Sequence, residues 1–136
     1  MKQFVDDISV NSIIGEGSFV EGNVNSAGFT KIDGDIKGSI SSKGRVVISQ
    51  DARVKGNVRA NAVVLGGIVN GDIIARDSVS LTKTAVVLGA IVTKKLIIEN
   101  GALFSGFCYA VNNHEGFEEA EQNYKNRRIV ENVTRR

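Results

Sequence analysis

Apolar residues recur along most of the chain in one short phrase: an apolar residue, any residue, glycine, any residue and a second apolar residue. The phrase occurs six times, first at residues 20–24 (VEGNV) and last at residues 104–108 (FSGFC). Its glycines are 16, 18, 15, 18 and 17 residues apart. A near-constant short period predicts a stacked repeat, in which each unit buries its apolar side against its neighbours.

Aligning the copies gives three apolar columns, one before each phrase and two within it. They are Ile14, Ile32, Ile48, Leu65, Leu81 and Ile98; Val20, Ile36, Val54, Val69, Val87 and Phe104; and Val24, Ile40, Val58, Ile73, Ile91 and Cys108. Small or apolar residues often lie two positions away, which is the period of a strand with one face inward. Three inward strands per repeat predict an all-β fold, a three-sided parallel β-helix of about six coils and about 30 Å in length at ~4.8 Å per coil.

The aligned glycines are predicted to form a corner between the second and third strands of each coil. Glycine reaches positive φ angles that other residues adopt only at a cost, and Asn23, Asn57 and Asp72 after it also favour turns. A loop that cradles phosphate is the functional alternative, but it needs a helix N-terminus behind it. No helix fits within the repeats, so we expect no cofactor there.

Composition and charge narrow the class of protein. The 17 Lys and Arg nearly balance the 15 Asp and Glu, which argues against a nucleic-acid partner. No run of eighteen apolar residues exists to span a membrane, and Asp6 and Asp7 argue against a cleaved signal peptide. The single cysteine excludes an internal disulfide and fits a reducing compartment, so a cytoplasmic location is expected.

Two segments flank the β-helix domain of residues 12–110. The N-terminal segment, residues 1–11, can cover the open end of the first coil, or Met1, Lys2, Phe4 and Val5 can contact a lipid surface. Such an anchor is weak for one molecule and becomes strong by avidity along a polymer.

The C-terminal tail, residues 111–136, has acidic residues at its start and basic residues at its end. A helix dipole favours this polarity, so we expect one charged helix, or a disordered tail. The tail either packs against the β-helix, remains free, or presents its basic end to an acidic partner or an anionic lipid.

Coils five and six place apolar residues at positions that the alternation predicts to face outward. These are Val86, Leu88, Val92, Leu103, Phe107 and Tyr109. We expect them to form a contiguous patch, and large exposed apolar patches usually mark contact surfaces.

Enzymes built on hexapeptide-type β-helices, acyltransferases or carbonic anhydrases, are the main rival interpretation. Their chemistry needs histidine as a general base or as several zinc ligands. This chain has one histidine, His114, in the charged tail, and Cys108 is expected to be a buried thiol in the last coil. We therefore predict no catalytic residues, no metal site, no cofactor and no small-molecule substrate.

The ends of a solenoid are its default functional sites, because the first and last strands lack a neighbour and invite another chain to continue the ladder. The last coil ends in Leu103, Phe104, Phe107 and Tyr109, three of which are aromatic, and burying such side chains in a joint between coils favours association. With Ile14, Val20 and Val24 at the other end, they predict end-to-end self-assembly into a filament. A monomeric adaptor that recruits a partner through its tail is a further alternative.

The repeated phrase, residues 46–58 and the closing segment 96–106 (LIIENGALFSG) resemble the bactofilins, a family of polymer-forming bacterial cytoskeletal proteins. The resemblance covers about residues 12–110. It implies a right-handed β-helix, filaments that form without nucleotide, and a scaffold at the inner face of the cytoplasmic membrane for cell-wall-modifying or shape-determining partners. Phe104 matches the family's aromatic position at the C-terminal joint.

Overall fold

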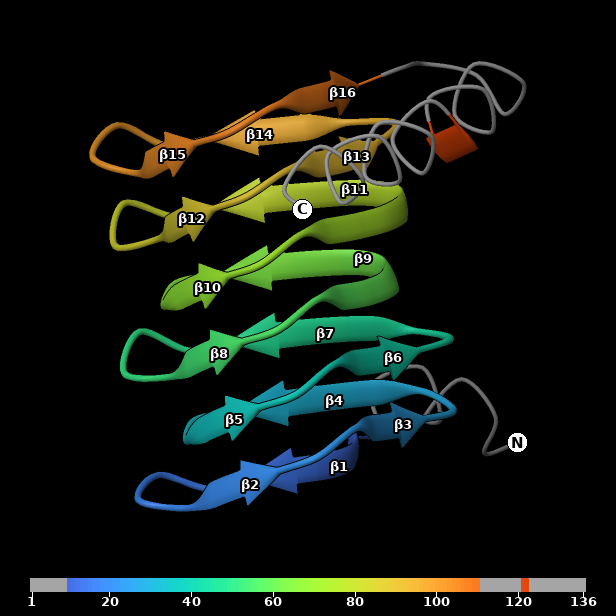
Figure 1. Ribbon diagram of the computed structural model, residues 1–136, viewed down its shortest axis with the longest axis vertical. Coiled ribbons are helices and arrows are strands. Elements are labelled where there is room, and N and C mark those ends of the chain that lie inside the picture. Colours follow the sequence, from blue (N-terminus) through green and yellow to red (C-terminus); the bar gives the residue numbers. More distant parts are fainter. Residues whose placement is uncertain (1–9, 111–120, 123–136) are drawn as a thin grey trace, which may run out of the picture.

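The computed structural model describes residues 10–110 and 121–122, and residues 10–110 form a parallel β-solenoid of six coils (Figure 1). The strands are β1 (Val10–Ile14), β2 (Phe19–Glu21), β3 (Val24–Ser26), β4 (Phe29–Ile32), β5 (Asp35–Lys37), β6 (Ile40–Ser42), β7 (Arg45–Ile48), β8 (Arg53–Lys55), β9 (Val58–Leu65), β10 (Ile68–Asn70), β11 (Ile73–Leu81), β12 (Val86–Leu88), β13 (Ile91–Thr93), β14 (Leu96–Ile98), β15 (Leu103–Ser105) and β16 (Cys108–Ala110). The first and last coils lie at opposite ends of the long axis.

The strands form three parallel stacks along this axis. The first stack is β1-β4-β7-β9-β11-β14, the second is β2-β5-β8-β10-β12-β15, and the third is β3-β6-β9-β11-β13-β16. Strands β9 and β11 run through a corner and therefore contribute to both the first and the third stack.

The register confirms all three apolar columns. In the first stack Ile48 pairs with Ile32 below and Leu65 above, and the column continues to Ile14 and Ile98. The other two columns stack in the same way, so each repeat unit of the sequence is one coil. A period-2 pattern fixes this register because a shift of one residue would turn every apolar side chain outward.

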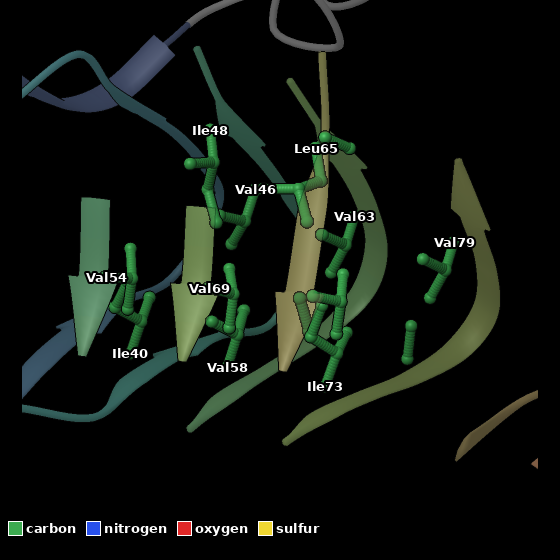
Figure 2. Close-up of a cluster of buried hydrophobic side chains, with 14 of the residues drawn as sticks. Ile40, Val46, Ile48, Val54, Val58, Val63, Leu65, Val69, Ile73 and Val79 are labelled. Atoms are coloured by element: carbon green, nitrogen blue, oxygen red, sulfur yellow. The ribbon is translucent and has the colours of Figure 1, made fainter. Parts of the chain in front are cut away.

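The core is the line of these inward side chains along the axis. Figure 2 shows Val54 and Val69 of the second stack meeting Ile40 and Val58 of the third. In coils two to five the three columns are completely or almost completely buried. The β-branched residues suit this narrow interior because they pack well on a pleated surface.

The six repeat glycines form the predicted corner, with φ angles between 123° and 158°. The Gly56 N–H donates to the carbonyl oxygen of Asn70 in the next coil at 3.1 Å. A Cβ atom on Gly56 would lie 2.0 Å from the carbonyl oxygen of Gly38 in the coil before, so the backbones approach too closely for any side chain. Close stacking, in addition to positive φ, therefore requires glycine here.

The residues after these glycines form side-chain hydrogen bonds between coils, which the sequence pattern did not predict. The Asn57 side-chain oxygen accepts from the Asp72 N–H at 3.0 Å, and the Asp72 carboxylate accepts from the Ala90 N–H at 2.8 Å. Each bond satisfies a backbone donor at the corner, where the strand ladder is interrupted.

Most of the two flanking segments lies outside the described residues. The predicted lipid contact at residues 1–5 and His114 are among the positions not described, while the first strand begins at Val10 and Glu121 and Gln122 are helical. Within residues 10–110 and 121–122, no helix has the length and apolar character needed to cross a membrane.

Candidate assembly interface

The C-terminal end of the solenoid exposes the end of the core. Strands β14, β15 and β16 each pair with a strand of coil five and, among the described residues, with no strand on their other side. Ile98 is 49% exposed, whereas Leu81, its register partner one coil earlier, is 0% exposed. The inward columns therefore continue to this end, where no further coil of the described residues covers them.

Phe104 occupies the same kind of position in the second stack. It pairs in register with the fully buried Val87, is half-buried, and packs against the main core. Smaller Val and Ile residues hold the earlier positions of this column. The aromatic ring thus provides the largest inward side chain at the open end.

The N-terminal end has the matching arrangement. Strands β1, β2 and β3 pair only with strands of coil two among the described residues. Ile14, Val20 and Val24 point inward and are half-buried against the core. Both ends consequently present three open apolar columns and three strand edges, which is the pattern that favours strand addition.

The structure separates the four residues predicted for the C-terminal joint. Phe104 alone of the four belongs to an inward column. Leu103 faces outward on β15 and is exposed, Tyr109 faces outward on β16 and is half-buried, and Phe107 lies at the corner between these strands. Their close spacing in the sequence therefore does not place them on one surface.

The six residues of the expected patch on coils five and six do not share one surface either, so the prediction holds only for the three of them on the second stack. Val86, Leu88 and Leu103 lie on the second stack, while Val92 and Tyr109 lie on the third. Val92 is also fully buried: with Ile74 and Ala90 it forms a second buried cluster, against which Tyr109 packs. An outward register position is exposed only where nothing packs over it.

An ion pair between distant parts of the chain lies beside this second cluster. The Glu121 carboxylate contacts the Arg59 guanidinium at 2.5 Å, and Arg59 is the register neighbour of Ile74. Glu121 is buried, which its position in a charged tail did not predict. The signal available in the sequence was the apolar outward column Ile74, Val92 and Tyr109, which marks a face that another segment can cover.

Cys108 corrects the expectation of a buried thiol. It lies in the third inward column beyond the fully buried Ile91, but it is exposed because no further coil of the described residues covers it. Partial burial still raises the pKa of the Cys108 thiol, which keeps it protonated and weakly nucleophilic at neutral pH.

Most other charged side chains of the coils are at least partly exposed, whereas Asp72 is buried at its corner. A hydrogen bond from the Ser49 side chain lowers the pKa of Asp33, and the nearby charge of Lys31 lowers it further. Burial of Asp33 has the opposite effect on this pKa. The Lys31 Nζ lies 3.5 Å from the Asp33 carboxylate. Among the residues that the structure describes, no group of three or more His, Cys, Asp or Glu side chains is placed to hold a metal ion.

Comparison with known proteins gives a consistent result. The model of the bactofilin family, described as polymer-forming cytoskeletal, matches residues 12–109. The chain is 29% identical over 99 residues to bactofilin BacO of Myxococcus xanthus, covering 73% of this chain and 79% of BacO. It is 27% identical over 96 residues to BacP of the same organism, of which it spans 40%.

A solved structure shares the fold. It is a cryo-EM reconstruction of double helical filaments of Thermus thermophilus bactofilin. The TM-score is 0.70 and the identity 32%, over 73% of this chain and 98% of that one.

Proposed function

Because this chain belongs to the bactofilin family of polymer-forming cytoskeletal proteins, we propose that it joins end to end into filaments without nucleotide. These filaments form a cytoplasmic scaffold at the inner face of the membrane, where they position cell-shape or cell-wall partners. The chain acts as a structural protein and not as an enzyme.

The observation that carries this proposal is the pair of open ends. Each end offers strand edges and inward apolar columns whose members are fully buried one coil further in. A second copy placed on an end would continue both the ladder and the core. Since both ends of one chain are open in this way, the addition can repeat and give a filament.

The energetics are compatible with reversible assembly. Full burial of a Val, Ile or Phe side chain contributes about 1.5–3 kcal/mol, and half-open side chains gain a part of that. Ladder hydrogen bonds add about 0.5–1.5 kcal/mol each, while association costs at least about 4 kcal/mol. Because the apolar gain depends on a few half-open side chains, one charge placed in the joint is expected to abolish assembly at micromolar concentration.

Nucleotide independence is supported by the role of the glycines. The repeat glycines lie at corners between strands, and in the described coils no glycine-rich loop precedes a helix. The backbone arrangement that cradles phosphates therefore does not occur in residues 10–110.

A single substitution at the C-terminal end tests end-to-end assembly. Phe104→Arg places a charge in the apolar joint, and we expect folded monomers or small oligomers instead of filaments by negative-stain electron microscopy without nucleotide. Ser105→Arg is the matched control, because Ser105 is exposed and faces outward on the same strand. Its register column already carries Lys37 and Lys55, so its filaments should persist.

Two results would overturn the proposal. Filaments of Phe104→Arg that match the parent would place the joint elsewhere. Discrete particles of about three chains in all samples would favour the hexapeptide-type enzymes.

The proposed membrane contact needs a separate experiment. Co-pelleting with liposomes that contain anionic lipid should fall when residues 1–5 are deleted, while sedimentation without liposomes stays unchanged. The comparison must use filaments, because the anchor of one molecule is weak and avidity strengthens it. Equal co-pelleting of the deleted and full-length chains would remove Met1, Lys2, Phe4 and Val5 from the interface.

A further inference from the structure

The outer face of the second stack is divided into two halves of different chemistry. Each of its strands turns its first and third residues outward, so the face carries two register columns. In coils two and three these positions hold Asp35, Lys37, Arg53 and Lys55. In coils four to six they hold no charge.

Four of the six outward residues in the uncharged half are apolar, and the other two, Asn70 and Ser105, are polar. The four apolar residues form one surface, which we call the apolar half. Its members are Ile68 on β10, Val86 and Leu88 on β12, and Leu103 on β15 (Figure 1). Ile68 is 39%, Leu88 46% and Leu103 64% exposed, and three neighbouring strands bring them together. Contiguous exposed apolar residues of this kind usually mark an interaction surface.

The other two faces do not offer such a surface. On the first stack the strongly exposed apolar residues are Ile13 in the first coil and Ile97 in the last, so they lie far apart. The residues between them in the same register column are Lys31, Val47, Val64 and Ser80. On the third stack the apolar residues Ile74 and Val92 are already buried. The apolar half is therefore the contiguous apolar surface that remains accessible on the described coils.

We infer that the apolar half is the seam along which two filaments of this chain lie side by side. This inference rests on the proposed end-to-end assembly. In a filament the apolar half recurs once per chain, and a second filament of the same chain is the partner whose contacts recur at the same spacing. A self-complementary contact also places apolar residues on apolar residues and leaves the charges of coils two and three at its border in water.

The size of the apolar half sets the order of events. Four partly exposed side chains are far fewer than the 20–30 residues per partner of a typical stable complex. One pair of such surfaces is too weak to hold two free chains together, whereas a row of them acts by avidity. Lateral pairing therefore follows longitudinal growth. The double helical filaments of the Thermus thermophilus relative support pairing of this kind.

A double variant tests the seam with side chains that the same face already accepts. Ile68→Arg copies Arg53 and Leu88→Lys copies Lys55, their counterparts in register columns of the second stack. Ser80→Lys is the control. It adds a charge to the same coil as Leu88, but on the outer face of the first stack, and the register column of Ser80 already contains Lys31. The readouts are mass per unit length by electron microscopy and the fraction of protein sedimented.

The double variant is expected to form filaments with half the parent's mass per unit length, while Ser80→Lys keeps the parent's value. Leu88→Lys alone should act in the same direction, which guards against a fold defect of the double variant. Adding Leu88→Lys to Phe104→Arg should leave its sedimentation velocity at micromolar concentration unchanged, because the seam alone is too weak to pair free chains.

Several results would overturn the inference. The first two are an unchanged mass per unit length in the double variant and single filaments in the parent. The others are the loss of all filaments in a folded double variant, and smaller oligomers of Phe104→Arg when Leu88→Lys is added. A parent that forms no filaments at all would instead refute the proposed end-to-end assembly itself, and the seam with it.

Discussion

The middle coils and the end coils of this solenoid carry the same inward columns in different surroundings. Leu81 is fully buried, whereas Ile98, the next residue of its column, is half exposed. The side chains are of the same type and point in the same direction, so the difference comes from the missing next coil. The comparison teaches that the candidate joint has the chemistry of the core and needs no specialised residues beyond Phe104.

The largest effect is expected in the middle of the stack. Gly56→Ala places a Cβ atom 2.0 Å from the Gly38 carbonyl oxygen, and the backbone must move to relieve the clash. We expect the free energy of unfolding, measured by urea titration in the Phe104→Arg background, to fall by at least about 3 kcal/mol. A loss below about 1 kcal/mol would show that the coils are not stacked this closely.

Truncation of one apolar column should distinguish the two regions next. Ile48→Ala removes a fully buried side chain and should cost about 2–5 kcal/mol, whereas Ile98→Ala should cost less than half as much in the same background. In the assembling parent, Ile98→Ala should additionally raise the critical concentration for sedimentation. Equal costs for the two variants in the monomer would contradict the open end.

Gly22 is the counterpart of Gly56 in the first coil and gives a smaller effect. A Cβ atom at Gly22 meets nothing within 4 Å, so Gly22→Ala causes no clash. It destabilises the fold only because alanine is strained at the φ angle of 123°. We expect a loss of about 1–2 kcal/mol in unfolding free energy. The added methyl group points to where a neighbouring copy would stack, so filament formation should weaken more than folding does. Unimpaired sedimentation would argue against a joint at this end.

The smallest effect concerns the charged surface of the coils. The pKa of Asp33 is lower in the folded chain than in the unfolded chain, where it is about 3.9. The ionised carboxylate therefore stabilises the fold at any pH above the unfolded pKa, and this stabilisation disappears as the pH falls through the lower pKa of the folded chain. Asp33→Asn should cost a few tenths of a kcal/mol at pH 7 and nothing near pH 2. Ser49→Ala should remove most of this difference, and a pH-independent cost of Asp33→Asn would contradict the assignment.

The sequence was sufficient to predict the coils and their register. The columns through Ile48, Val54 and Val58 have a fixed period, and one glycine per coil marks the same corner, so the alternation of apolar and polar residues left a single register. This reasoning is local and repetitive, which is why it succeeded for the fold.

The surfaces were harder to predict because exposure depends on what packs over a residue. Val92 and Cys108 were assigned to the correct faces, yet Val92 is buried and Cys108 is exposed. The contact between Arg59 and Glu121 joins residues more than sixty positions apart, and no periodic pattern encodes it. The Asn57 and Asp72 side-chain bonds depend on corner geometry that residue spacing alone does not specify.

Alkylation of Cys108 tests the central claim most directly. It is the chain's single cysteine, it lies in an inward column of the last coil, and it is exposed when no other copy covers it. The account predicts that a maleimide labels Cys108 at least ten times more slowly in parent filaments above the critical concentration than in folded Phe104→Arg monomers, both measured at one mildly alkaline pH. Equal labelling rates in filaments and monomers would contradict a joint formed by the C-terminal coil.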